Sequence, residues 1–263
     1  MAASALLTIM VNAARKAGRS LTHDFGEIEN LQVSKKGPAD FVSTADRRAE
    51  EIVFGELRKA RPTYGFLLEE SGEVKGTDGQ HRWIVDPLDG TTNFLHAIPL
   101  FAVAIALQRG PDIAAGVIYN PVTEELFTAE RGSGGFLNGR RLRVAARTRL
   151  EDCVGVTGIK RTVAERDARD VRAVARLNTI LAGIRRTGSA SIDLAWLAAG
   201  RFDVMWETGL SPWDIAPGLV IVREAGGIVT DMEGGLNMLA NGSLVAGNEF
   251  VQRALLRELA LVP

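Results

Sequence analysis

The sequence predicts a mixed α/β protein that folds as one compact unit. Segments with helical apolar spacing, such as residues 3–17, alternate with short apolar segments separated by Gly, Pro and Asn turn signals. The pattern changes near Leu150, which predicts two closely packed halves, residues 1–150 and residues 151–263. A chain of 263 residues with 46% hydrophobic residues can bury a core of this size.

The chain begins with two predicted helices. Residues 3–17 place apolar side chains on one face, and Gly18 is expected to end this helix. Residues 31–41 contain Gly and Pro and are expected to form a hairpin or an irregular loop. A second helix is then predicted from about residue 44 to about residue 60.

The rest of the first half predicts a meandering sheet. Turn signals such as Gly110-Pro111-Asp112 separate the expected strands, which cover residues 64–68, 83–86, 101–108, 113–119 and 125–129. The glycine-rich segment 131–142 is expected to be a hairpin tip. It does not fit a dinucleotide-binding loop, because no strand and helix flank its glycines in the required order.

In the second half strands again alternate with helices. The strands are expected over residues 154–157, 184–187, 202–207, 228–231 and 244–246. The helices are expected over residues 163–181, 191–199, 212–225 and 249–259, with Ser189, Ser211 and Asn248 as caps. Pro217 lies inside the third of these helices, where it removes a backbone donor and is expected to kink the first turns.

One stretch, residues 83–94, reads W-I-V-D-P-L-D-G-T-T-N-F and is longer than a turn requires. The apolar strand reaches Asp86, Pro87 is expected to end it, and Asp89 follows three residues after Asp86. Two carboxylates this close repel each other and favour a divalent cation that prefers oxygen ligands. The next residues are typical of a helix N-terminus, which attracts phosphate. This stretch therefore indicates a metal-assisted phosphatase site, with a solvated Asp-rich turn as the alternative.

This stretch resembles the metal-binding signature of the inositol monophosphatase family, D-P-[LI]-D-G-T-x-N-F. Further family motifs follow in the right order and spacing over nearly the whole chain: P-A-D…S-T-A-D, E-E-S, R-T-G-S-A and W-D-x-A-x-G…E-A-G-G. The resemblance implies the layered α-β-α-β-α sandwich of the inositol monophosphatase and fructose-1,6-bisphosphatase type, with the site between the two halves. It also implies a homodimer.

The resemblance further implies two or three Mg²⁺ ions, with Mn²⁺ as a possible substitute. Oxygen ligands suit these ions better than they suit zinc. The implied ligands are the side chains of Glu69, Asp86, Asp89 and Asp214 and the carbonyl of Leu88. Glu69, Asp86 and Leu88 would hold one ion, and Asp86, Asp89 and Asp214 the second.

By the same resemblance, Thr91, linked to Asp46, orients or deprotonates the attacking water. These two residues and Glu69 are the expected catalytic group. The expected substrate contacts are Leu88, Asp89, Gly90, Thr91, Arg185, Glu207 and Asp214. Glu70, next to Glu69, is expected to point elsewhere.

Taken singly, several of these residues have simpler explanations. Asp46 and Asp214 lie in the first turns of predicted helices, where an acid compensates the helix dipole. For Ser189 the simpler explanation is a role as a helix cap and nothing more. Adjacent acids that leave a strand, such as Glu69 and Glu70, are usually exposed to solvent.

The resemblance and the site chemistry predict a Mg²⁺-dependent enzyme that hydrolyses myo-inositol monophosphate with a metal-activated water and is inhibited by lithium. Another phosphate monoester could be the substrate: histidinol phosphate, fructose-1,6-bisphosphate, NADP or 3′-phosphoadenosine phosphate. The other alternative is a binding protein of the same family that acts on the transcription machinery.

The composition of the chain bears on its possible partners and on its cellular compartment. The net charge of −1 favours neither nucleic acid nor a membrane surface. The longest apolar segment, residues 97–107, is too short to span a bilayer. The single Cys153 excludes an intrachain disulfide and fits a reducing cytoplasm.

Overall fold

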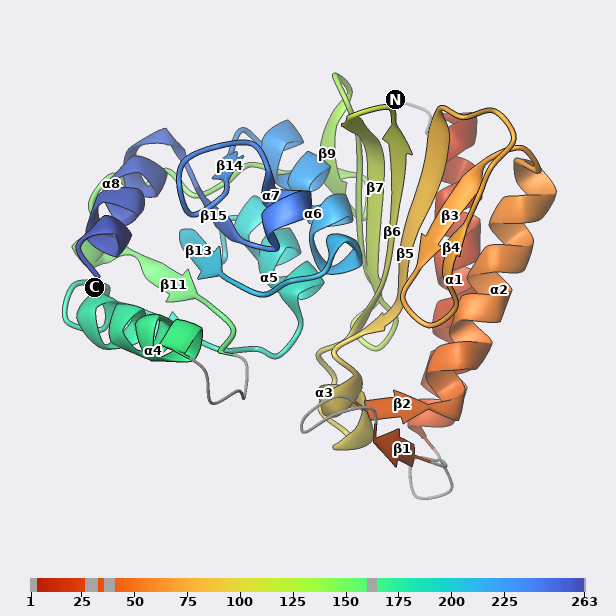
Figure 1. Cartoon of the computed structure of the whole chain (residues 1–263), viewed down its shortest axis with the longest axis horizontal. Helices are drawn as coiled ribbons and strands as arrows, with labels where there is room; N and C mark the ends of the chain where they lie inside the picture. Colours follow the sequence, from red (N-terminus) through yellow and green to blue (C-terminus); the bar gives the residue numbers. More distant parts are fainter. Residues whose placement is uncertain (1–3, 27–32, 36–40, 160–164, 263) are drawn as a thin grey trace.

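The computed structural model describes residues 4–26, 33–35, 41–159 and 165–262. These residues form five stacked layers (Figure 1): two helices, an eight-stranded sheet, two helices, a five-stranded sheet and two helices. The sandwich that the sequence predicts is therefore confirmed. Helices α1 (Ala5–Phe25) and α2 (Thr44–Ala60) cover the outer face of the larger sheet. Helices α5 (Ala190–Ala198) and α6 (Pro212–Glu224) lie between the two sheets. Helices α4 (Glu165–Leu177) and α8 (Glu249–Ala260) cover the outer face of the smaller sheet.

The eight-stranded sheet is antiparallel except where β3 (Gly65–Leu68) and β5 (His81–Asp89) run parallel, side by side. Its spatial order is β10 (Arg140–Arg141), β9 (Gly134–Leu137), β8 (Glu125–Glu130), β7 (Asp112–Asn120), β6 (Ala102–Arg109), β5 (His81–Asp89), β3 (Gly65–Leu68) and β4 (Gly72–Val74). The pairing of β9 with β10 confirms the predicted hairpin tip. Strand β4, which continues the sheet past β3, was not predicted.

The five-stranded sheet is mixed. Its spatial order is β12 (Gly183–Arg185), β11 (Val154–Val156), β13 (Val204–Glu207), β15 (Leu244–Gly247) and β14 (Ile228–Thr230). Strand β11 runs parallel to both of its neighbours, whereas β15 runs antiparallel to both of its own. Every strand of this sheet follows Leu150 in the chain, and every strand of the larger sheet precedes it.

The short elements lie beside the two sheets. Strands β1 (Val33–Lys35) and β2 (Phe41–Ser43) pair antiparallel, in and just after the segment 31–41 for which a hairpin or an irregular loop was expected. Residues 31–32 and 36–40 of that segment lie outside the described part. Helix α3 (Thr91–Leu95) follows β5 directly, and α7 (Met238–Asn241) and a 3₁₀ turn (Leu150–Asp152) were not predicted. Within the described residues, no helix has both the length and the apolar character needed to cross a bilayer.

Three apolar cores hold the five layers together. The first core packs α1 and α2 against the outer face of the larger sheet, and Trp83 and Phe94 are fully buried in it. The second core lies between the sheets around α5 and α6 and contains Ile84 and Ile215. The third core lies between the smaller sheet, α4 and α8, and contains Trp206 and Cys153. Neighbouring residues Trp83 and Ile84 serve different cores because side chains alternate along a strand.

Helix α1 does not end at Gly18, as the sequence suggested, but continues to Phe25. The glycine has a packing role instead. A Cβ at Gly18 would lie 2.7 Å from Tyr119 Cε1 and 3.1 Å from Pro121 Cβ, so the missing side chain lets α1 approach the larger sheet. The packing between helix and sheet thus outweighs the low helix propensity of glycine.

We expect Gly18→Ala to lower the free energy of unfolding by about 1 kcal/mol or more, although alanine favours a helix, because the added methyl overpacks against Tyr119. Gly55→Ala, in the exposed middle of α2 with no atom within 4 Å of its Cβ, is the matched control and should stabilise by about 0.5–1 kcal/mol. Urea unfolding of both variants measures the difference. Equal stabilisation by both would contradict the packing role.

One prediction about proline is also corrected. Strand β5 continues through Pro87 to Asp89, and its pairing with β6 shifts between Asp86 and Asp89. A bulge tolerates the residue without an N–H, so the proline lies at the irregularity and does not end the strand. Helix α6 runs as one helix through the buried Pro217, and Asp214 in its first turn lies beside Asp86 and Asp89. The kink expected at Pro217 stays a prediction.

Candidate active site

Among the described residues, six acidic side chains from four separate segments meet at the end of the neighbouring parallel strands β3 and β5. They come from the first turn of α2, the turn after β3, the end of β5 and the first turn of α6. Their carboxylates form two groups, each with ligand atoms within 4.8 Å of one another: Asp46, Glu69 and Glu70 in the first, Asp86, Asp89 and Asp214 in the second. All four acids expected as metal ligands are therefore in these groups.

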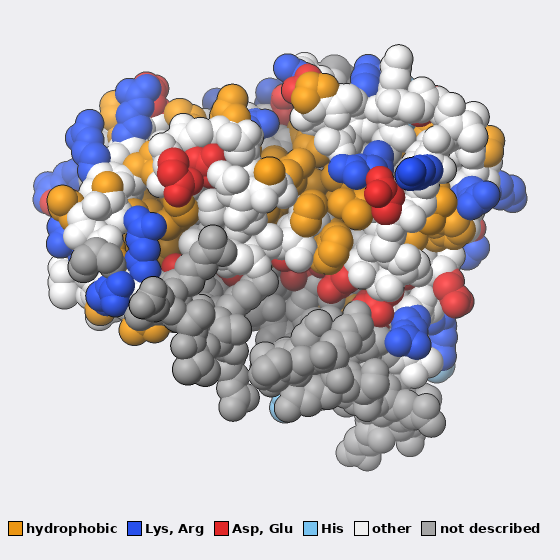
Figure 2. Space-filling view, viewed as in Figure 1, with side chains coloured by type: hydrophobic (Ala, Val, Ile, Leu, Met, Phe, Trp, Pro, Cys, Tyr) orange, Lys and Arg blue, Asp and Glu red, His pale blue; other side chains and the backbone are white. Residues whose placement is uncertain are grey.

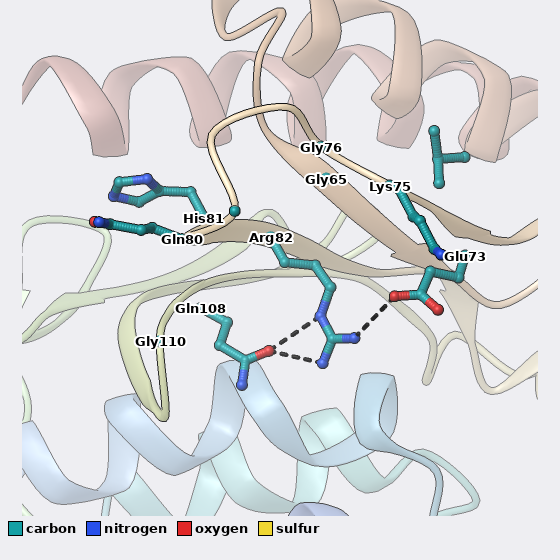
Figure 3. Close-up of a pocket in the computed structure, with 11 residues that line it drawn as sticks. Gly65, Glu73, Lys75, Gly76, Gln80, His81, Arg82, Gln108 and Gly110 are labelled. Atoms are coloured by element: carbon teal, nitrogen blue, oxygen red, sulfur yellow. Dashed lines mark hydrogen bonds and ion pairs between the residues drawn. The ribbon is translucent and has the colours of Figure 1, made fainter.

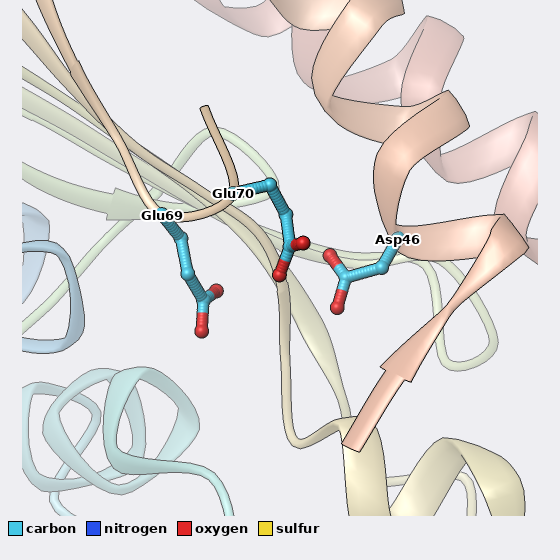
Figure 4. A group of neighbouring side chains, drawn as sticks. All are labelled: Asp46, Glu69 and Glu70. Carbon is cyan, nitrogen blue, oxygen red and sulfur yellow. The ribbon is translucent and has the colours of Figure 1, made fainter. Parts of the chain in front are cut away.

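Glu70 was expected to point away from the site, but its carboxylate lies beside those of Asp46 and Glu69 (Figure 4). Strand β3 ends at Leu68, and the following residues form a turn, so side chains no longer alternate between two faces. The turn is fixed by the buried Glu50 of α2, which accepts from the backbone N–H of Glu70 (2.8 Å) and from the hydroxyl of Ser71. That anchoring contact was not recognisable from the sequence.

Hydrogen bonds from the backbone and from serine hydroxyls orient the second group. Asp86 Oδ1 accepts from the N–H of Leu88 (2.9 Å), within the bulge of β5. Asp89 Oδ2 accepts from Ser189 Oγ (2.6 Å) and from the N–H of Ser191 (2.7 Å). The end of β5 in the larger sheet and the start of α5 in the middle layer thus meet at one carboxylate.

Asp214 has the helix-start role that the sequence allowed. Its Oδ2 accepts from the N–H of Ser211 (2.8 Å) in a capping box, with Pro212 at the first helical position. Because this cap also brings Asp214 beside Asp86 and Asp89, the capping and ligand explanations are compatible.

Burial and mutual repulsion shape the electrostatics of these acids. Burial raises the pKa of Glu69 from 4.5 to about 8, with further increases from Asp214, Glu70 and Asp89. Burial raises the pKa of Asp86 well above its usual range, and the charge of Glu69 adds to the effect. Burial also raises the pKa of Asp89, although hydrogen bonds from Ser189 and Ser191 oppose this. Without a bound cation, it is therefore unfavourable for all of these carboxylates to be ionised at the same time.

The donors present fit a hard divalent cation. Glu69 Oε2 is buried and has no hydrogen-bond partner among the described residues. Such an orphaned carboxylate oxygen is suited to a metal ion, since an unpaired buried charge is otherwise costly. The two acid groups offer only oxygen ligands, and this favours Mg²⁺ or Mn²⁺ over zinc.

Thr91 lies close to the first acid group and to the end of β5. Its Oγ1 is 3.0 Å from the carbonyl oxygen of Leu88 and 3.4 Å from Asp46 Oδ2, and the hydroxyl can donate to either one. Gly90 immediately before it has φ +96°, and a Cβ there would lie 2.8 Å from the carbonyl oxygen of Leu100. Only glycine therefore lets the chain turn from β5 into α3 at this point.

The two remaining predicted contacts lie on the smaller sheet. Glu207, at the end of β13, is buried, and a Cβ at Gly158 would fall 2.0 Å from its Oε1. Arg185, at the end of the edge strand β12, is exposed and donates to the carbonyl of Ile184 (3.0 Å). Its neighbour Arg186 donates to the carbonyl of Ile159 (3.1 Å).

A cavity of about 350 Å³ lies away from the acids, at the opposite end of β5, and is lined by Arg82, His81 and several glycines (Figure 3). The guanidinium of Arg82 is already engaged by Gln108 (2.8 Å) and Glu73 (3.5 Å). On the face in Figure 2, basic side chains are most numerous near the left edge of the described surface, and basic and acidic side chains mix on the right.

The five-layer fold and its converging oxygen ligands define a class of metal-dependent enzymes that hydrolyse phosphate monoesters. The chain belongs to the inositol monophosphatase family, whose sequence profile matches residues 3–261. This membership confirms the prediction of a phosphoric monoester hydrolase.

Three comparisons show how closely the chain follows its relatives. An inositol-1-monophosphatase of Mesorhizobium japonicum is 62% identical over 98% of this chain and 97% of its own length. The Nus factor SuhB of Salmonella typhimurium is 44% identical over 97% and 95%. The crystal structure of the extragenic suppressor protein suhB from Bartonella henselae matches with a TM-score of 0.95 at 57% identity, covering 98% of this chain and 99% of that one.

Proposed function

We propose that this protein is a Mg²⁺-dependent phosphatase that hydrolyses myo-inositol monophosphate to inositol and phosphate. The observation that carries the proposal is the convergence of two carboxylate groups from four segments, with a buried Glu69 oxygen that lacks a partner among the described residues. The identity to inositol-1-monophosphatases supports the substrate.

The proposed ligands are Glu69, Asp86, Asp89, Asp214 and the carbonyl of Leu88. Bound divalent cations supply positive charge for the phosphate and lower the pKa of water. Uncatalysed hydrolysis of these esters is so slow that the site has to lower the barrier by roughly 20 kcal/mol.

The protein's own groups position the reactants. The hydroxyl of Thr91 donates toward Asp46, so its oxygen can accept a hydrogen bond from the attacking water. As this oxygen takes the proton of the water, the hydroxyl passes its own proton to Asp46. The first N–H groups of α3, beginning at Thr91, have no partner inside the helix and can hold phosphate oxygens. Gly90 permits this approach because it has no side chain.

For the inositol part of the substrate we propose hydroxyl contacts from Glu207 and Asp214, with Arg185 at the rim. Glu207 can accept from two hydroxyls, and its carboxylate packs directly against Gly158, where any side chain would clash with it. We also propose that the protein is a cytoplasmic homodimer, as the family resemblance implies; the single buried Cys153 fits a reducing compartment.

Phosphate release from a panel of monoesters tests the proposal. The panel holds myo-inositol 1-phosphate, histidinol phosphate, fructose-1,6-bisphosphate, NADP and 3′-phosphoadenosine phosphate, each with and without Mg²⁺. We expect Mg²⁺-dependent release that is fastest for inositol phosphate and inhibited by lithium, which competes for a magnesium position. Faster release from another ester would change the substrate, and no release from any of them would overturn the enzymatic proposal.

A second candidate function follows from the 44% identity to a Nus factor. We propose binding to the transcription machinery as an additional activity that does not need the acids. Retained capture of RNA polymerase by Asp89→Asn would support it, whereas loss of capture together with turnover would tie any binding to the metal site.

A further inference from the structure

The carboxylate of Asp89 is oriented by a loop that is itself held in place by residues with no role in the proposed chemistry. Ser189 Oγ and the N–H of Ser191 both reach Asp89 Oδ2 from the start of α5. The accuracy of this contact depends on how rigidly the chain just before α5 is held.

A buried acid holds this segment. Asp193, which is 2% exposed, accepts from the hydroxyl of Thr187 (2.6 Å). The same hydroxyl oxygen accepts from the N–H of Ser189 (3.3 Å), the residue that contacts Asp89. A path of hydrogen bonds therefore leads from Asp193 through Thr187 and Ser189 to Asp89.

Helix α3 holds the segment from the other side. The amide of Asn93 in α3 donates to the carbonyl of Thr187 (2.8 Å) and to the carbonyl of Leu100 (2.7 Å). Gly188 has φ +89°, and a Cβ there would lie 3.0 Å from the Asn93 amide. Only glycine therefore fits at this position of the loop.

A simpler role for Asp193 is compensation of the dipole of α5, in whose first turn it lies. Yet the helix already has its cap, because Ser189 Oγ accepts from the N–H of Ile192. The carboxylate of Asp193 instead receives the hydroxyl of Thr187, two residues before the cap. Its contact therefore fixes the loop outside the helix.

We propose that Thr187 and Asp193 are positioning residues that hold Ser189 so that the carboxylate of Asp89 faces the cation. This inference rests on the proposed metal-dependent function. Removal of hydrogen bonds that orient a metal ligand typically lowers metal affinity or activity about 10- to 100-fold.

The test compares Thr187→Val, which has the same shape but no hydroxyl, with Thr187→Ser, which keeps the hydroxyl. Mn²⁺ binding to metal-stripped protein is measured by electron paramagnetic resonance, together with thermal midpoints and the Mg²⁺ concentration for half-maximal activity. We expect Thr187→Val to weaken Mn²⁺ binding about 10-fold and to lower kcat more than it changes KM. Thr187→Ser should restore both values, and Thr179→Val, at an exposed threonine, is the matched control.

A double-mutant cycle tests the link to Asp193. Asp193→Ala should produce the same loss as Thr187→Val, and the double variant should lose little more, because both changes break one contact. Asp193→Asn keeps an acceptor for the hydroxyl and should bind Mn²⁺ nearly as the parent does. Additive losses would overturn the link.

The outcomes separate this inference from the proposed function. If Thr187→Val is folded and binds Mn²⁺ as the parent does, the positioning role is wrong while the metal site stands. If the parent itself binds no Mn²⁺, the proposed function fails first. If Thr187→Val unfolds, Mn²⁺ binding to Thr187→Ser and Asp193→Asn tests the inference instead. Both folded variants keep the hydroxyl and its acceptor, so weaker Mn²⁺ binding in either would contradict the positioning role.

Discussion

Asp89→Asn is expected to lower kcat/KM by about 10³-fold while the protein stays folded. The carboxylate lies in the second acid group and is held from two directions by Ser189 and Ser191. An amide keeps the shape but removes the charge that a divalent cation needs, and a metal ion supplies several kcal/mol of charge stabilisation, at about 1.4 kcal/mol for each tenfold in rate.

Steady-state phosphate release and circular dichroism measure this effect. Asp112→Asn is the matched control, because it removes an acid from an exposed ion pair with Arg131 and should leave turnover unchanged. Glu69→Gln should also abolish turnover. Substantial activity in folded Asp89→Asn or Glu69→Gln would remove these residues from the ligand set.

The second large effect concerns stability without metal. Because burial raises the pKa of Glu69 to about 8 in the folded state, folded protein binds this proton more tightly than unfolded protein does. The metal-free protein should therefore be destabilised as the pH rises from about 4.5 through 8. Saturating Mg²⁺ at pH 8 should offset this and raise Tm by about 5 °C or more, since ligand at 100 times its Kd stabilises by about 2.7 kcal/mol.

Thermal unfolding in EDTA and in Mg²⁺, between pH 5 and pH 8, tests this. Glu69→Gln is the control, because an amide cannot titrate: in EDTA it should be more stable than the parent at pH 8 and similar to it at pH 5. A variant that loses activity while gaining metal-free stability is the signature of a strained ligand site. The idea fails if the parent and the variant show the same dependence on pH.

The sequence predicted the parts of the site that are continuous along the chain. Asp86, Asp89 and Thr91 lie within a few residues of one another, so their proximity followed from the motif. The caps Ser189, Ser211 and Asn248 were also predicted correctly, because a cap acts on its own helix.

The errors came from contacts between segments far apart in the chain. Gly18 seemed to end a helix because its packing against Tyr119 is not visible locally, and Pro87 seemed to end a strand because the bulge depends on β6. The predicted orientation of Glu70 was wrong because the turn after β3 is anchored by Glu50 of α2, which lies 20 residues earlier in the chain. The hydroxyl of Ser189 on Asp89 had no local signal either.

The distribution of the acids along the chain also has a consequence for biosynthesis. Glu69, Asp86 and Asp89 are made early, whereas Ser189 and Asp214 belong to segments that leave the ribosome much later. Domains form during synthesis from the N-terminus onward. The growing chain therefore carries most of the proposed cation ligands long before it can enclose a cation, and we expect turnover to begin only after α6, with Asp214, has docked. Onset of turnover during translation would thus report completion of the sandwich.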